Sequence, residues 1–96
     1  MSGGVFGGLP DALIQFQTTV GTSAVNITSS APADSLTFLA DAGNSASIFL
    51  GKSSSVTTSN GFPLAAGGSI TLKISDSSLV YAISSSSSQT LHTIGS

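Results

Sequence analysis

The sequence predicts an all-β protein, and three observations support that prediction. Strong helix formers are scarce, because the 96 residues include two lysines, one methionine, no glutamate and no arginine. Serine, threonine, valine, isoleucine, phenylalanine and glycine are abundant, and they favour strands joined by turns. Apolar and polar residues alternate with a period of two in several short segments, as in strands with one buried face.

A chain of this length is one domain at most, with one thin core. We expect a single antiparallel β-sandwich, jelly-roll-like, with about seven or eight short strands separated by turn residues. The sandwich is predicted over residues 13–96, after a glycine-rich arm over residues 1–12. Glycines oppose regular structure in the arm, whereas Val5, Phe6 and Leu9 offer apolar side chains either to a partner or to the chain's own sandwich as a cap.

The first half of the chain contains four segments with strand alternation. Asp-Ala-Gly-Asn at 41–44 is predicted to reverse the chain tightly between the third and the fourth. The residues predicted to face the core are Ile14, Phe16 and Val20, then Val25 and Ile27, then Leu36, Phe38 and Ala40, and finally Ile48 and Leu50.

The second half repeats this pattern. The segments "SLTFLADAGNSASIF" and "SITLKISDSSLVYAI" each contain a strand, an aspartate-containing turn and an apolar return, which we interpret as two similar hairpins of a jelly-roll layout. A last strand follows the serine-rich stretch, over 91–94. The predicted core faces are Ile70, Leu72 and Ile74 in one strand and Leu79, Tyr81 and Ile83 in the next.

Charge is unusually rare. Only 6% of residues are charged, against about 25% in an ordinary soluble domain, while 40% are hydrophobic. A nearly uncharged surface promotes association, so we expect partners to cover much of it. With a net charge of −2 and only Lys52 and Lys73 as fixed cations, the chain lacks the basic surface that nucleic-acid binding requires. We also expect no secretory signal and no membrane span, because no positive n-region and no long apolar run occur.

Catalytic and metal-binding patterns are weak. Cysteine is absent, so no thiolate site exists, and the four aspartates lie far apart beside small residues that suit turn capping. His92 is the single histidine, no G-x-S-x-G occurs, and we interpret His92 as a polar-face residue of the last strand. The end of a phosphate-binding loop is imitated around Lys52, but Ala46 stands where its first glycine would be. We therefore expect neither enzyme activity nor a cofactor or metal.

Two further motifs are interpreted as structural. The glycosylation sequon at Asn26 is taken as a coincidence of a threonine-rich strand, because no secretory signal is expected. Tyr81 is the single tyrosine and tryptophan is absent, so placing Tyr81 in the core weakens a sugar-stacking role.

The stretch "SNGFPLAAGGS" at 59–69 is predicted to form a stiff elbow. Pro63 restrains its own φ and extends Phe62, and the glycine pair at 67–68 turns the chain into the next strand. Two interpretations stay open. Phe62 and Leu64 plug one end of the sandwich, or Phe62 and Pro63 form an exposed tip that inserts into a neighbouring subunit.

Residues 47–94 also carry a family resemblance. An aliphatic strand ending in glycine, a Ser-Val-Thr-Thr-Ser-Asn-Gly stretch, the Phe-Pro-Leu elbow, a Gly-Ser-Ile-Thr-Leu strand and Leu-Val-Tyr-Ala-Ile follow one another. This series resembles small virion proteins of tailed bacteriophages, whereas the first 46 residues match no pattern of that family. The resemblance implies β-sandwich subunits that decorate or cement a capsid, commonly as trimers, or form small head or tail appendages.

From this resemblance we expect a structural protein of the virion, a capsid decoration or cement subunit. Its expected partners are copies of itself, with a trimer favoured, and the major capsid protein or another virion protein. A receptor-binding or host-attachment module of a phage tail or fibre is the alternative. The residues expected to contact other subunits are Val5, Phe6 and Leu9 in the arm and Asn60, Phe62, Pro63 and Leu64 in the elbow.

Overall fold

The computed structural model describes residues 13–28, 34–74 and 76–96, and these residues are all-β, as predicted. The predicted arm, with Val5, Phe6 and Leu9, lies outside the described residues. One short 3-10 helix, η1 (Ser77–Leu79), interrupts the strands. The eight strands of the described chain are β1 (Ile14–Val20), β2 (Val25–Asn26), β3 (Leu36–Ala40), β4 (Ile48–Gly51), β5 (Phe62–Leu64), β6 (Ser69–Leu72), β7 (Tyr81–Ser84) and β8 (Gln89–Gly95).

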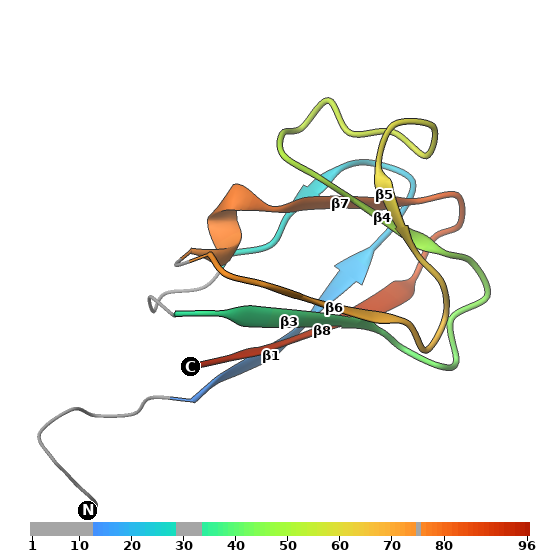
Figure 1. The fold of residues 1–96 in the computed structure, drawn as a ribbon. Coiled ribbons are helices and arrows are strands. Elements are labelled where there is room, and N and C mark those ends of the chain that lie inside the picture. Colours follow the sequence, from blue (N-terminus) through green and yellow to red (C-terminus); the bar gives the residue numbers. More distant parts are fainter. Residues whose placement is uncertain (1–12, 29–33, 75) are drawn as a thin grey trace, which may run out of the picture.

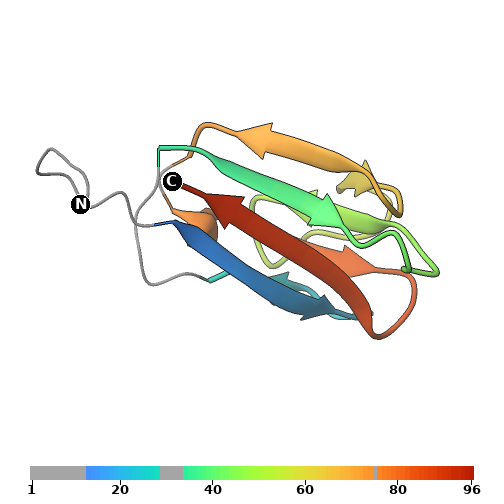
Figure 2. The same ribbon diagram turned by 90° about the horizontal axis from the view of Figure 1, so that it is seen from below.

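The strands form two four-stranded antiparallel sheets that pack face to face (Figure 1). One sheet has the order β1-β8-β3-β6, which Figure 2 shows edge to edge, and the other has the order β2-β7-β4-β5. Successive strands alternate between the sheets, except that β4 and β5 are neighbours in one sheet. This strand order is that of a jelly roll, so the predicted fold class is confirmed.

The two predicted hairpins are wrong. Asp41 and Asn44 do form a turn, since Asn44 N–H donates to the Asp41 carbonyl at 3.0 Å, but β4 then lies in the opposite sheet from β3. The reason is that β8 and β6 already occupy both sides of β3. The chain likewise crosses between sheets from β6 to β7. The hairpin that the fold does contain joins β4 to β5.

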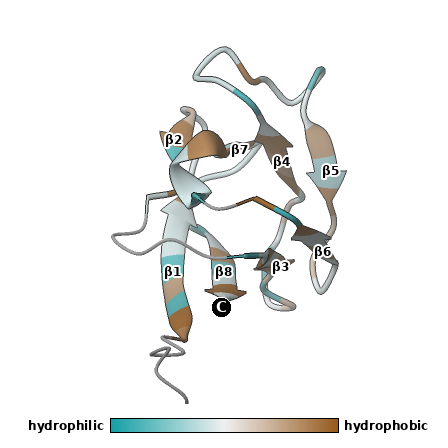
Figure 3. Ribbon diagram, turned by 60° about the vertical axis from the view of Figure 1, so that its left-hand side comes forward, coloured by the Kyte–Doolittle hydropathy of each residue, from teal (hydrophilic) through white to brown (hydrophobic). Residues whose placement is uncertain are grey.

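The core lies between the sheets and follows most of the predicted alternation. Bands of hydrophilic and hydrophobic colour alternate along β1 in Figure 3, and Ile14 and Val20 are buried there. Phe38 and Ile48 are fully buried, one from each sheet. Partly buried residues of β6 and its continuation pack against this core as predicted, namely Ile70, Leu72 and Ile74.

The predicted core face of β7 is wrong. Val80, Ala82 and Ser84 point inward, whereas Tyr81 and Ile83 lie on the outer face. Leu79, predicted to face the core, belongs to η1 and is 58% exposed. Asp76 caps this short helix, and the strand begins only after it. Small residues fit inside β7 because Ala82 lies opposite two apolar residues across its ladders, Val25 and Leu50.

Candidate interaction surfaces

The predicted elbow is strand β5, and its three residues have different environments. Phe62 is 54% exposed and Pro63 is also exposed, so both are accessible to a partner as one interpretation expected. Leu64 is 4% exposed and joins the core, as the interpretation of the elbow as a plug expected. Because it is buried, Leu64 is not available as a contact residue. β5 is at the end of its sheet, a position that tolerates the missing N–H of Pro63.

The loop between β4 and β5 folds back over the outer face of its sheet, and in Figure 1 it rises above β4. Val56 anchors this loop: it is 6% exposed and packs where a Cβ on Gly51 would otherwise stand. Asn60, another predicted contact residue, is exposed and holds the loop from within. Its side-chain Oδ1 accepts a hydrogen bond from Thr57 N–H at 2.7 Å. The loop is therefore pre-shaped by its own residues.

The outer face of the β2-β7-β4-β5 sheet is apolar. Pro63, Phe49 and Ile83 lie in one row across three strands, because Phe49 pairs with both of the others. Tyr81 lies in the next row, opposite Gly51. Tyr81 was expected in the core, but it faces outward. Burial therefore no longer argues against a sugar-stacking role for its ring.

The outer face of the β1-β8-β3-β6 sheet is mixed, and its strands contain no fixed charge. One row across all four strands contains Gln17, His92, Leu39 and Ser69. Leu39 is 38% exposed, and Ile94 in the neighbouring row is 45% exposed. Sheet faces with exposed aliphatic residues and no fixed charge within their strands suit contact with another protein.

The charged residues described in the structure all lie outside the strands. They occupy connections at the ends of the sheets, and they are Asp34, Asp41, Lys52, Lys73 and Asp76. As a result, neither sheet face and no sheet edge of the described chain carries a fixed charge within a strand. Scarcity of charge was evident in the composition, but its confinement to the connections follows from the fold.

The four sheet edges are not equally protected against pairing with another chain. Charges, proline and short length are the usual protections of an edge strand. β2 has two residues, β5 has three and contains Pro63, and β6 has four. β1 has seven residues, no proline and no charge, and it pairs with β8 on one side and with no described strand on the other. The β1 edge is therefore the one best suited to pairing with a further strand.

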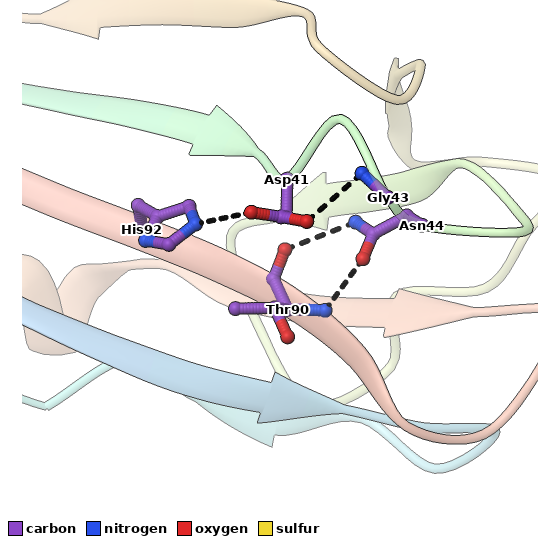
Figure 4. Close-up of polar contacts among 5 residues, drawn as sticks. All are labelled: Asp41, Gly43, Asn44, Thr90 and His92. Atoms are coloured by element: carbon purple, nitrogen blue, oxygen red, sulfur yellow. Dashed lines mark hydrogen bonds and ion pairs between the residues drawn. The ribbon is translucent and has the colours of Figure 1, made fainter.

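His92 lies half-buried on the outer face of β8, as predicted, and contacts Asp41 (Figure 4). Its Nε2 is 2.8 Å from Asp41 Oδ1, while Asp41 Oδ2 accepts a hydrogen bond from Gly43 N–H at 2.9 Å. The hydrogen bond with His92, followed by that from Gly43, lowers the pKa of the Asp41 carboxyl. Asn44 and Thr90 join the same two segments through two hydrogen bonds.

This cluster ties the β3–β4 connection to β8. A Ser-His-Asp site needs a nucleophile hydrogen-bonded to the histidine. Within residues 13–28, 34–74 and 76–96, the side-chain hydrogen bond found for His92 is the one to Asp41. The arrangement thus matches a clamp between two segments that are 51 positions apart in the sequence.

Other sequence motifs have structural roles. Asn26 Nδ2 donates to the carbonyls of Ser78 and Val80 at 2.8 and 3.1 Å, so the sequon amide is partly buried and holds the backbone around η1. Asp76 caps η1 as expected of a turn aspartate, and hydrogen bonds from the Ser78 hydroxyl and N–H lower its pKa. No cluster of metal-ligating side chains occurs among the described residues, and no helix among them is long and apolar enough to cross a membrane.

One buried residue in this region was missed by the sequence analysis. Gln89, 3% exposed, accepts hydrogen bonds at Oε1 from the N–H groups of Ser45 and Ala46. Its Nε2 donates to the Ser87 carbonyl at 2.8 Å and to Ser45 Oγ at 3.2 Å. A glutamine after a serine-rich stretch carries no sequence signal of burial, so only the fold reveals this role.

The strand order places the chain in the class of jelly-roll β-sandwiches. No protein-family model, no curated protein and no solved structure matches this chain. The function must therefore be argued from the surfaces themselves, because a fold of this kind hosts many functions.

Proposed function

We propose that this chain is a non-enzymatic structural subunit of a tailed-phage virion, of the capsid decoration or cement type. The observation that carries the proposal is the long, uncharged edge of β1, which no other described strand covers, beside sheet faces whose strands contain no fixed charge. The virion setting comes from the resemblance of residues 47–94 to small phage proteins. The support for self-association comes from the β1 edge and from the outer faces of the two sheets.

The β1 edge supports self-association because a free strand edge presents backbone N–H and C=O groups to any second strand. A neighbouring copy can satisfy these groups and at the same time cover the exposed aliphatic residues beside them. A trimer, the number that the resemblance implies, would require the β1 edge of one copy to meet a different surface of the next, since a three-fold ring uses heterologous contacts. Partners that bind only the folded subunit also raise its stability.

A charge placed on the β1 edge tests the assembly. Gln17 is exposed at the centre of β1, and Gln17→Lys adds the type of residue that natural edges use to prevent pairing. Ser85→Lys adds the same charge at an exposed position between β7 and β8 and is the matched control. We expect light scattering to show an oligomer for the parent chain and for Ser85→Lys, and a shift toward monomer for Gln17→Lys. A monomeric parent chain at high concentration would contradict the proposal.

The virion setting requires a separate measurement. Quantitative mass spectrometry of purified particles should find this chain at a copy number that is a multiple of the number of symmetry-related positions in the capsid. A few copies confined to the tail would instead favour the alternative, a receptor-binding module of a tail or fibre. That second function is favoured by one feature of the structure, a cavity beside the exposed ring of Phe62.

A further inference from the structure

The cavity lies where β4 ends and β5 begins, and its volume is about 420 Å³. This volume is within the roughly 300–1,000 Å³ typical of small-molecule sites. Residues from a single segment, 50–62, line it. It is on the layer of β4 and β5, whereas the β1 edge belongs to the other sheet, so this inference does not rest on the proposed assembly.

The lining combines one apolar wall with several polar groups. Leu50 and the 54% exposed ring of Phe62 supply apolar surface. Ser53, Ser55 and Asn60 supply hydroxyl and amide groups. A lining that contains both an aromatic ring and hydrogen-bonding side chains matches a saccharide ring, which has an apolar C–H face and a rim of hydroxyl groups.

Lys52 adds one cation to this lining. In the part of the chain that the structure describes, the one ion pair joins Asp41 to His92, so no described carboxylate neutralises Lys52. A single ammonium group among neutral polar groups matches a ligand with one carboxylate. A glycine-rich loop leading into a helix N-terminus is a common polyphosphate site, and this loop leads into strand β5 instead.

The loop that carries these groups is held in shape before any ligand binds. Val56 is buried at its centre, and Asn60 Oδ1 accepts from Thr57 N–H. Gly61 N–H donates to the Thr57 carbonyl at 2.9 Å, and the Ser53 and Ser55 hydroxyls lie 2.6 Å apart. A pre-formed loop loses little conformational freedom on binding, which favours affinity for a small ligand.

We propose that this cavity binds an acidic saccharide, a sugar ring that carries one carboxylate. In this arrangement the Lys52 ammonium pairs with the carboxylate and the Phe62 ring stacks on the C–H face. Ser53, Ser55 and the second Nδ2–H of Asn60 contact ring hydroxyl groups, since the first Nδ2–H donates to the Ser55 carbonyl at 3.4 Å. A uronic acid and a sialic acid share this chemistry, and the experiment below separates them.

The test is an NMR titration of the full-length, ¹⁵N-labelled chain with methyl β-glucuronide and, separately, with N-acetylneuraminic acid. We expect saturable shifts of the amide signals of residues 51–62 with at least one of the two acids. Methyl β-glucoside has the same ring as the glucuronide without the carboxylate, and it should bind at least tenfold more weakly than the glucuronide if that is the preferred acid. If N-acetylneuraminic acid is preferred, its methyl ester serves as the uncharged counterpart.

Variants locate the contacts. Lys52→Met removes the charge and keeps the aliphatic stem, and Phe62→Ala removes the ring; each should weaken binding about tenfold, equivalent to about 1.4 kcal/mol. Lys73→Met is the matched control, because Lys73 is the other lysine and does not line the cavity; it should change the affinity by less than twofold. Retained amide dispersion in each variant shows that the chain still folds.

Several outcomes would overturn the proposal. They are the absence of saturable shifts in residues 51–62 with both acids, equal binding of the charged and uncharged sugars, and equal losses in Lys52→Met and Lys73→Met. Inorganic phosphate is the charge-only probe. If phosphate moves the same signals with the same affinity as the sugars, the cavity is a general anion site and the saccharide assignment is wrong.

Discussion

Val56 occupies the space directly above Gly51, on the outer face of the β2-β7-β4-β5 sheet. A Cβ built on Gly51 would collide with the Val56 side chain, and one built on Gly61 would stand 2.7 Å from the Cβ of Phe49. Two glycines thus let the β4–β5 loop lie close against its own sheet. This packing holds the walls of the proposed saccharide site.

Gly51→Ala should destabilise the protein by about 1–3 kcal/mol, because the added methyl group overpacks the contact with Val56. Urea denaturation measures the free energy of unfolding. Gly21→Ala is the matched control: the nearest atom to its added Cβ is the Ser87 Cα at 3.9 Å, so its effect should stay within about 0.5 kcal/mol. Equal losses in the two variants would show that glycine itself, rather than the contact, matters at both sites.

Gln89→Ala should lower the free energy of unfolding by about 1–3 kcal/mol, because the N–H groups of Ser45 and Ala46 lose their acceptor. Gln15→Ala removes the same side chain from an exposed position on β1, and we expect a change within about 0.5 kcal/mol. Urea denaturation of both variants makes the comparison. A Gln89→Ala protein as stable as the parent would mean that solvent replaces these hydrogen bonds at no cost.

Thr93→Val should raise the free energy of unfolding by about 1 kcal/mol. Thr93 is 1% exposed, and its hydroxyl is buried without a hydrogen-bond partner among the described residues, so valine retains the shape and removes a polar cost. Ser84→Ala is the opposite case, because Ser84 Oγ donates to the Ser47 carbonyl at 2.8 Å; it should lower stability by about 1 kcal/mol. Thermal unfolding that moves both variants in the same direction would refute this account of the core hydroxyls.

The Asp41 carboxyl predicts a loss of stability in acid. Its pKa in the folded protein lies below the ordinary 3.8, first because of His92 and then because of Gly43 N–H. A carboxyl with a lowered folded pKa stabilises the fold above its unfolded pKa, and that contribution disappears as the pH falls through the folded value. The parent chain should therefore lose more stability than Asp41→Asn between about pH 5 and about pH 2.

His92→Gln is the companion variant for this measurement. It removes the principal cause of the lowered pKa of Asp41, so its acid profile should approach that of Asp41→Asn. Asp76 keeps its own hydrogen bonds in all three proteins and contributes equally to each profile. Superimposable pH profiles for the parent and both variants would show that the contact between His92 and Asp41 contributes nothing measurable.

Local patterns predicted most of the strand faces. Ile14, Phe38 and Ile48 were assigned to the core from alternation alone, and all three are buried. Alternation mispredicts the face of Tyr81, because η1 shifts the start of β7 and the inward residues of β7 are the small Ala82 and Ser84. It also missed β5 as a strand, since a three-residue edge strand containing Pro63 has no period of its own.

The elbow shows why the candidate surfaces were only partly foreseeable. Both interpretations of Phe62 and Leu64 were drawn from the same residues, and the structure supports a part of each, because the two side chains differ in exposure along one short strand. The residues around Lys52 fail the phosphate-loop motif at Ala46, so the sequence alone assigns Lys52 no ligand. Its place in a cavity with Phe62 depends on the loop returning toward β4, which Val56 and two glycines make possible.

By itself, the sequence determined that the chain is all-β, that its strands carry one apolar face each and that charge is nearly absent, because these properties depend on residue type and near neighbours. The tertiary structure alone decided which strands pair, since β3 pairs with the distant β6 and β8 and not with β4, the next strand in the sequence. It also decided that the fixed charges of the described residues lie in connections and that no other described strand covers the edge of β1. Those outcomes depend on long-range contacts whose free energy arises only when the two sheets close on a common core.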